Sequence, residues 1–151
     1  MTAEDRLNDF ISKVEQYIES KSLGPRDIDD ECLASDGLSV DELQNLSKDD
    51  CFAHAYKLYQ YADHIANEKA NQENVCRWCE LSLNSIMAQE IDNGLIAKYE
   101  MKVAKVLLEN ELAATISKWK QHAESRLAKL SSREFNVRKK ADILFEKGKR
   151  K

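Results

Sequence analysis

The spacing of apolar residues predicts helices along almost the whole chain. Near the N-terminus, apolar residues recur at intervals of three and four at Leu7, Phe10, Ile11, Val14, Tyr17 and Ile18. Thr2 precedes this run as a candidate N-cap. Gly24 supplies a C-terminal turn and Pro25 cannot continue a helix, so we expect an N-terminal helix within residues 1–23.

The next segment is acidic and carries few apolar positions. Its sequence, "GPRDIDDECLASDG", predicts a linker over residues 24–38. Two capping boxes follow. Ser39 with Glu42 starts a short helix, and Ser47 with Asp50 starts the next one.

Two long helices make up the rest of the pattern. No residue breaks the first between Lys48 and about Asp92, and the Asn-Gly pair at 93–94 predicts a tight turn. A second helical pattern runs over 96–130, and the serine pair at 131–132 favours the start of a last helix. The expected fold is all-α, an elongated antiparallel helical hairpin or bundle formed by residues 39–151.

The apolar stripe of the first long helix changes phase. At 100° per residue, one face carries Phe52, Ala55, Tyr56, Tyr59, Ala62 and Ala66. After the polar stretch "NEKANQEN" the apolar positions are Val75, Cys79, Leu83 and Ile86, which point elsewhere. Either the helix bends or changes register here, or its halves pack on different partners, one of them from another chain. Because a hairpin has too little core to cover both faces, we expect a homo-oligomer.

Length and charge narrow the class of protein. The 151 residues suit one domain, and no apolar run approaches 18 residues. Without a signal-peptide pattern we expect a soluble protein of the cytoplasm, of the host cytoplasm if viral, with no membrane contact. The net charge is −9 over residues 1–50, −3 over 51–94 and +8 over 95–151. Such asymmetry would let a polyanion dock on the C-terminal third, while the acidic N-terminal third repels it, pairs with the basic part of a neighbouring subunit or meets a basic protein. A solvated helix surface sorted by sign is the alternative.

Cys76 and Cys79 form a CxxC in "NVCRWCE", where neither glycine nor proline supplies a turn. A structural zinc site needs four ligands, and the chain has no second CxxC. We therefore expect reduced thiols packed on a helix face, with a metal shared between two subunits as a weaker alternative. The three histidines are scattered and no glycine-rich loop is present, so we expect no enzyme activity, no catalytic residues, no metal and no cofactor.

The C-terminal third carries the candidate nucleic-acid-binding residues. These are the cations Lys118, Lys120, Arg126, Lys129, Arg133, Arg138, Lys139, Lys140, Lys147, Lys149, Arg150 and Lys151. Trp119, Phe135 and Phe145 lie between them. Cations that neutralise phosphates and aromatic rings that stack on bases favour single-stranded DNA as the ligand. The alternative places the aromatic rings in the helix interface and the cations in solvent.

Several stretches resemble the phage proteins grouped with UvsY, the recombination mediator of T4-like phages. They are "LSVDELQNLSKDD", "AYKLYQYADHIANEKANQENVCRWCELSLNSIMAQEI" and the basic tail "RLAKLSSREFNVRKKADILFEKGKR". The stretch from Ala55 to Ile65 resembles the start of the family's first long helix most closely. The resemblance covers residues 39–150 and leaves the acidic N-terminus outside.

The resemblance implies a protein that binds single-stranded DNA, assembles into rings and helps load a RecA-like recombinase onto strands coated by single-strand-binding protein. The family's basic DNA-contacting residues fall near the end of the first long helix. The corresponding stretch here, "SLNSIMAQE", has no Lys or Arg. The cations for DNA must therefore come from the C-terminal third. A helical protein–protein adaptor without nucleic-acid affinity is the competing hypothesis.

Overall fold

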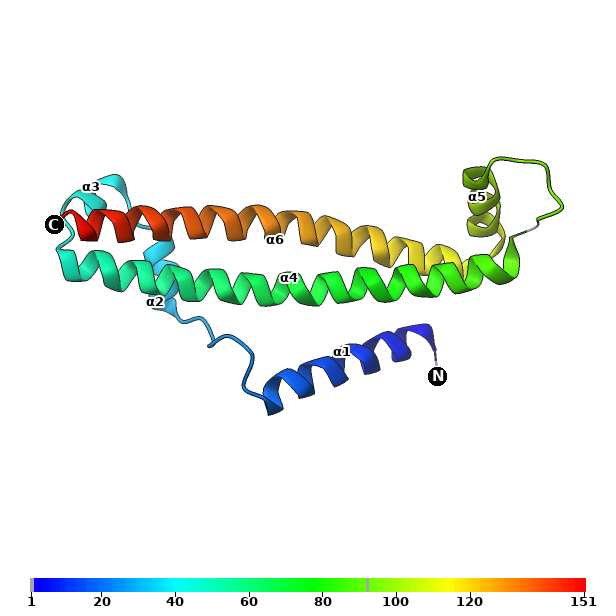
Figure 1. Cartoon of the computed structure of the whole chain (residues 1–151), viewed down its shortest axis with the longest axis horizontal. Helices are drawn as coiled ribbons and strands as arrows, with labels where there is room; N and C mark the ends of the chain where they lie inside the picture. Colours follow the sequence, from blue (N-terminus) through cyan, green and yellow to red (C-terminus); the bar gives the residue numbers. More distant parts are fainter. Residues whose placement is uncertain (1, 92) are drawn as a thin grey trace. The chain divides into compact units, whose positions relative to one another are not determined.

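The computed structural model describes every residue except Met1 and Asp92. The predicted end of the first long helix, at about Asp92, therefore lies outside the described residues. The described residues form helices and no strand, which confirms the predicted all-α class. The helices are α1 (Ala3–Ser20), α2 (Asp30–Asp36), α3 (Val40–Gln44), α4 (Lys48–Glu90), α5 (Tyr99–Glu109) and α6 (Glu111–Lys149) (Figure 1).

The chain divides into two compact units, and α4 and α6 contribute to both. Unit 1 comprises Met1–Glu15 and Asn71–Leu127, and unit 2 comprises Gln16–Ala70 and Ala128–Lys151. In unit 2, α4 and α6 run antiparallel, because Tyr59 contacts Asp142 while Lys69, further along α4, contacts Glu134. The same direction holds in unit 1, where Gln72 contacts Arg126 and Met87 shares a core with Ala113. The predicted antiparallel helical hairpin is confirmed.

Each unit has its own apolar core. In unit 2 the core cluster consists of the buried residues Ala55, Leu58, Ala62, Ile65, Val137, Ala141 and Leu144. In unit 1 the core consists of Met87, Val106 and Ala113, with the half-buried residues Leu83, Ile86, Ile91, Val103 and Leu107 around them. Helix α5 supplies three of these residues. It therefore closes the core of unit 1 against α4 and α6.

The phase change of the α4 stripe comes from its period. One set of buried and half-buried residues recurs along α4 at alternating spacings of four and three, at Cys51, Ala55, Leu58, Ala62, Ile65, Lys69, Gln72, Cys76, Cys79 and Leu83. A stripe that repeats every 3.5 residues drifts by about 20° per heptad around a straight helix. When the residues are projected at 100° each, the stripe therefore shifts steadily around the helix and gives the impression of a phase change. Both halves of α4 pack on α6 of the same chain. The stripe by itself therefore requires no second chain.

The facing positions of α6 follow the same heptad. They are Ala113, Ile116, Lys120, Ala123, Leu127, Leu130, Glu134, Val137, Ala141, Leu144 and Gly148. A Cβ on Gly148 would lie 2.9 Å from the Phe52 ring, so only glycine fits this contact without a shift of the ring. The polar stretch 67–74 of α4 spans the boundary between the units at residues 70 and 71. The polar stretch thus marks where one core ends and the next begins.

The sequence pattern predicted one long helix after the Asn-Gly pair, but Asn110 divides this region into α5 and α6. Asn110 has an extended backbone (φ −108°, ψ 104°) and its side-chain oxygen accepts a hydrogen bond from the Ala113 amide at 3.0 Å. It therefore ends α5 and caps α6. The prediction that residues 131–132 start a last helix is wrong, since α6 continues through both serines.

The predicted linker over residues 24–38 contains helix α2. Asp29 caps this helix by accepting a hydrogen bond from the Cys32 amide at 3.0 Å. The two predicted capping residues that follow are confirmed, since Ser39 accepts from Glu42 at 3.2 Å and Ser47 from Asp50 at 3.1 Å. Asp29 has the same role without a glutamate three positions later, which is why the capping-box pattern missed it.

Helix α1 begins as predicted and ends earlier. Thr2 caps it, accepting from the Asp5 amide at 3.1 Å. Its C-terminal turn uses Ser22, which has a φ of 52°, instead of the predicted Gly24. The Ser22 and Leu23 amides donate to the carbonyls of Glu19 and Ile18, which is a Schellman motif with serine at the left-handed position.

Ser22→Gly is expected to stabilise the end of α1. Glycine adopts a left-handed conformation without the penalty of about 1–2 kcal/mol that a Cβ carries, although it loses more backbone entropy. Amide hydrogen exchange over residues 16–23 should slow. Ser20→Gly, which places glycine inside the last helical turn, should speed exchange over the same residues. Equal effects from the two substitutions would contradict this role for Ser22.

Lys69 and Glu134 occupy core-facing heptad positions, with Nζ 3.7 Å from the carboxylate and side-chain exposures of 32% and 18%. Replacing both with leucine should stabilise unit 2 by about 1 kcal/mol or more, because apolar packing at such positions usually exceeds the value of a partly desolvated ion pair. Denaturant unfolding of the double variant measures this change. A lower midpoint than that of the wild type would show that the polar pair stabilises the seam.

Candidate nucleic-acid interface

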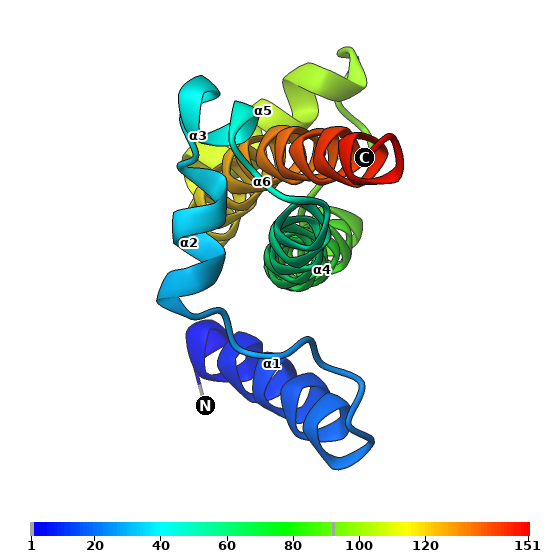
Figure 2. The same cartoon turned by 90° about the vertical axis from the view of Figure 1, so that its left-hand side faces the viewer.

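Unit 2 brings together the most basic and one of the most acidic segments of the chain. The second half of α6 with the C-terminal residues, 128–151, has nine basic and three acidic residues, a net charge of +6. Residues 29–46, which we call the acidic clasp, have six acidic and no basic residues, a net charge of −6. The clasp contains α2 and α3, which lie beside α4 and α6 (Figure 2).

Asp36, the last residue of α2, joins the clasp to α6. Its carboxylate accepts a hydrogen bond from Arg133 and lies 2.9 Å from Lys140 Nζ, which also donates to the Asp36 carbonyl at 3.3 Å. The Asp36 side chain is only 15% exposed. Burial alone would raise the pKa of Asp36, but the hydrogen bonds from Lys140 and Arg133 outweigh it and lower the pKa. Two of the predicted DNA-binding residues are therefore paired within the chain.

Two further cations bind backbone carbonyls of the clasp. Lys147 donates to the Leu43 carbonyl and Lys151 to the Leu46 carbonyl. Leu43 lies in the last turn of α3, where carbonyls have no partner within the helix and attract cations. The side chains of Leu38, Leu43 and Leu46 also pack against the core of unit 2. The α3 end of the clasp is thus held by apolar contacts as well as by charge.

The α2 end of the clasp is attached to α4. Lys57 Nζ lies 3.2 Å from both Asp29 and Glu31, and a hydrogen bond of 2.8 Å joins Ser35 Oγ to His54 Nδ1. Helix α2 buries only Cys32 and Ser35. Polar contacts therefore provide much of its attachment.

Other cations of the predicted set pair along α6 or with α4. Arg138 lies 3.2 Å from both Asp63 and Glu134. Lys120 pairs with Glu124 at 3.8 Å, and Lys149 with Glu146 at 3.4 Å. Arg126 donates to Gln72 at 3.4 Å. These contacts connect exposed or half-buried side chains, so each is worth little and competes poorly with a polyanion.

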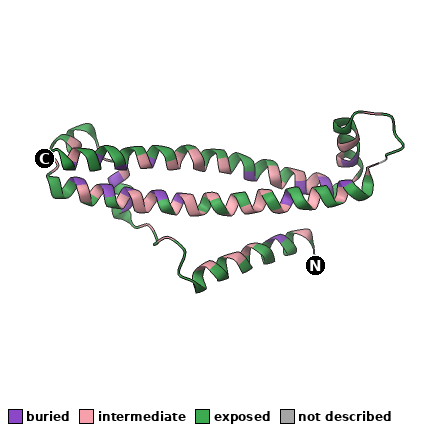
Figure 3. Ribbon diagram, in the orientation of Figure 1, coloured by how far each residue is buried: buried purple, intermediate pink, exposed green. Residues whose placement is uncertain are grey.

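Four predicted cations make neither an ion pair nor a side-chain hydrogen bond with a described residue. They are Lys118, Lys129, Lys139 and Arg150, and all four are exposed. Their heptad positions lie away from the α4 seam. Lys139 lies over the Phe135 ring at 5.5 Å. A shallow hollow of 430 Å³ is lined by Lys139, Asp142, Ile143, Glu146, Lys147 and Arg150. We call Lys129, Phe135, Lys139, Ile143 and Arg150 the outer strip; it belongs to the exposed side of α6 (Figure 3).

The aromatic residues divide between surface and interface. Phe135 is 61% exposed, whereas Phe145 is 39% exposed and its ring packs against Phe52 with centroids 5.6 Å apart. Trp119 is half-buried. Phe135 is therefore the ring best placed to stack on a ligand.

The tyrosines of α4 also divide. Tyr59 and Tyr61 pack against the core, whereas Tyr56 is 60% exposed. The Tyr59 hydroxyl donates to Asp142 at 2.5 Å, and this hydrogen bond raises the pKa of Tyr59 to about 12. This hydrogen bond links α4 to α6 within unit 2.

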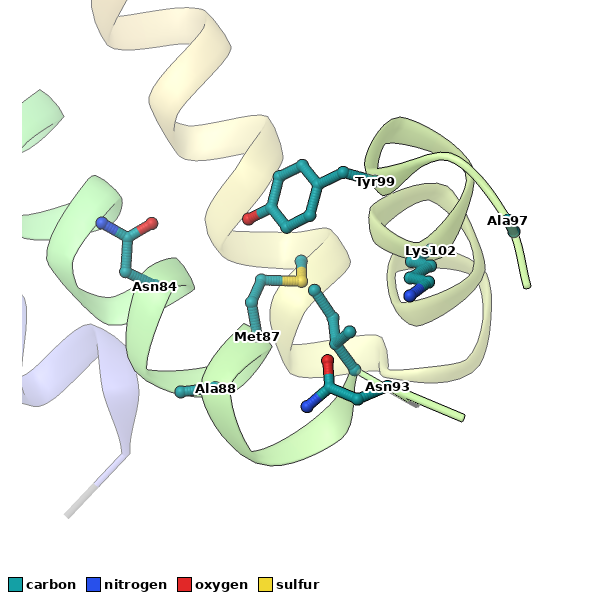
Figure 4. A pocket seen from close by; sticks show the side chains of 8 residues that line it. Asn84, Met87, Ala88, Asn93, Ala97, Tyr99 and Lys102 are labelled. Atoms are coloured by element: carbon teal, nitrogen blue, oxygen red, sulfur yellow. The ribbon is translucent and has the colours of Figure 1, made fainter. Parts of the chain in front are cut away.

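Unit 1 has several strongly exposed apolar residues. Ile96 is fully exposed and Leu108 is 88% exposed, with Met101 at 63%. A hollow of 520 Å³ lies nearby, lined by residues that include Met87 and Tyr99 (Figure 4). Its lining is mixed apolar and amide in character. These features are typical of a surface that contacts another protein.

The CxxC residues lie at core-facing positions of α4. Cys79 is completely buried, as predicted, and Cys76 is half-buried. Burial raises the pKa of both thiols, which makes them less reactive. Within the described part of the chain, no group of three or more His, Cys, Asp or Glu side chains is arranged to hold a metal ion.

Comparison with known proteins gives no match to a family model, to a curated protein or to a solved structure. The resemblance to the UvsY group therefore stays a prediction from sequence patterns. Among the described residues, no helix has both the length and the apolar character needed to cross a membrane.

Helix α2 is expected to loosen in acid. Hydrogen bonds from the Cys32 amide, followed by Lys57, lower the pKa of Asp29 to about 2, and the pKa of Asp36 is also lowered. Carboxylates whose pKa is lowered on folding stabilise above their unfolded value of 3.8, and this contribution is lost as the pH falls toward 2. Amide exchange over residues 30–36 should therefore speed up, relative to 55–65, as the pH falls from 5 to about 2. Unchanged relative protection at pH 2 would contradict it.

Proposed function

We propose that this protein is an oligomeric accessory protein that binds single-stranded DNA through the second half of α6. As the resemblance to the UvsY group implies, it would help load a RecA-like recombinase onto strands coated by single-strand-binding protein. The observation that carries the proposal is the outer strip, in which unpaired cations alternate with an exposed aromatic ring.

The chemistry of the outer strip suits a single strand. Lys129, Lys139 and Arg150 are free to neutralise phosphates, and Phe135 offers a face on which an unpaired base can stack. Base stacking of this kind requires bases that are not already stacked in a duplex. Without an arrangement of polar groups aimed at base edges, the binding would be independent of sequence.

A single outer strip offers few phosphate contacts, so one chain would bind weakly. Self-association would place several strips on one strand and raise the affinity through effective concentration. The exposed apolar residues Ile96, Met101 and Leu108 of unit 1 provide a candidate surface for this contact.

The same apolar residues support a second candidate function, that of a helical adaptor that binds other proteins. An adaptor would bind its partner through apolar contacts that persist in high salt. It would show no affinity for oligonucleotides even in low salt. The salt dependence of binding therefore distinguishes the two functions.

Replacing Lys129, Lys139 and Arg150 together with alanine should weaken binding to a labelled single-stranded oligonucleotide by about tenfold or more in low salt. The slope of log affinity against log salt should fall by about 2, because each lost phosphate contact contributes about 0.7 for single strands. Fluorescence anisotropy across a salt series, with the mass of the protein measured on the same samples, tests this expectation.

The matched control replaces Lys98, Lys102 and Lys105 of unit 1 with alanine, which removes the same charge from another part of the chain. It should change the salt slope far less. If both triple variants weaken binding equally, the attraction is general and the outer strip is not the site. If the wild-type protein binds no oligonucleotide at low salt, the adaptor function is favoured instead.

A further inference from the structure

The clasp occupies part of the surface that DNA would use. Arg133 and Lys140 lie on α6 between the outer-strip residues Lys129 and Arg150 in sequence, and both are bound to Asp36. The net charges of the clasp and of residues 128–151 are equal and opposite, −6 and +6. Because these charges cancel, the clasp and residues 128–151 together would attract a polyanion much less than residues 128–151 alone.

Asp36 presents to α6 the chemistry that a phosphate would present. Its two carboxylate oxygens are shared between a guanidinium and an ammonium group, with a backbone carbonyl as a further acceptor for Lys140. Arg and Lys bind phosphate oxygens with the same donors and similar distances. A DNA phosphate and Asp36 therefore compete for the same two cations.

Helix α2 is the part of the clasp that is able to yield. Asp36 lies at the C-terminal end of α2, where the helix dipole disfavours a carboxylate unless cations compensate it. Apart from buried Cys32 and Ser35, α2 is held by the Lys57 ion pairs and the bond from Ser35 to His54. The α3 end is anchored by three leucines in the core. Gly37, which caps α2, separates the two parts.

We propose that α2 is an autoinhibitory element that masks Arg133 and Lys140 and is displaced from them by the phosphates of a single strand. The proposal rests on the proposed function. Unmasking adds two cations to the outer strip, so full binding follows only when a strand is long enough to displace Asp36. Short anions would not displace Asp36, so Arg133 and Lys140 would stay paired with it in their presence.

Asp36→Asn tests the mask directly, because it removes the charge and keeps the size of the side chain. The variant should bind a labelled single-stranded oligonucleotide about three- to tenfold more tightly, because the strand no longer has to displace a charged competitor. Its salt slope should be similar to that of the wild type, because both complexes contain the phosphate contacts of Arg133 and Lys140. Asp30→Asn is the matched control: it removes one charge from an exposed residue of the same helix. Asp36→Glu keeps the charge and should bind as the wild type does.

Hydrogen exchange provides a second measurement that does not depend on affinity. Amides of residues 30–36 should exchange faster in Asp36→Asn than in the wild type, and faster in the wild type once a saturating oligonucleotide is added. Amides of α3 should change little. If residues 30–36 become no more exposed on DNA binding, displacement is overturned.

The outcomes separate the two proposals. If the wild type binds DNA and Asp36→Asn and Asp30→Asn change its affinity equally, the proposed masking by α2 is overturned and the DNA-binding function stands. Absence of binding by the wild type and by every variant would overturn the DNA-binding function, and the mask with it. Tighter binding by Asp36→Asn alone, with faster exchange in α2, would support both.

Discussion

The apolar seam between α4 and α6 is the constraint on which the rest of the structure depends. Small residues such as Ala62 and Ala141 alternate in it with Leu58 and Val137, so the two helices approach closely while the polar faces stay outward. The charged contacts that α6 makes with other segments of unit 2 depend on this packing, because it fixes which positions of α6 face α4 and which face away. The charges themselves are too exposed to determine the fold.

The heptad sorts the cations of α6 into two groups. Positions next to the seam, such as Arg133 and Arg138, come within reach of Asp36 or Asp63 and are paired. Positions on the far side, such as Lys139 and Arg150, meet no acidic partner among the described residues. Helix α6 therefore has one group of cations without an acidic partner among the described residues and a second group that is already paired with carboxylates.

The acidic clasp gives the uneven charge of the chain a physical role. Its carboxylates and the carbonyls of Leu43 and Leu46 bind the cations that the C-terminal third carries in excess. Self-repulsion among those cations is reduced, and the α3 end gains apolar contacts with the core. The exposed apolar residues Ile96, Met101 and Leu108 belong to unit 1, so the proposed nucleic-acid contact and the proposed protein contact involve different parts of the chain.

Local signals in the sequence determined the helical class and several of the helix starts. The all-α class, the caps at Thr2, Ser39 and Ser47 and the basic character of α6 all depend on side chains close to one another in the chain. Tertiary structure decided the rest. The pairing of Asp36 with Arg133 and Lys140, about a hundred positions away, depends on the register of α4 against α6, which no local pattern contains. For the same reason, only the tertiary structure decides which cations of α6 are paired with carboxylates and which have no acidic partner among the described residues.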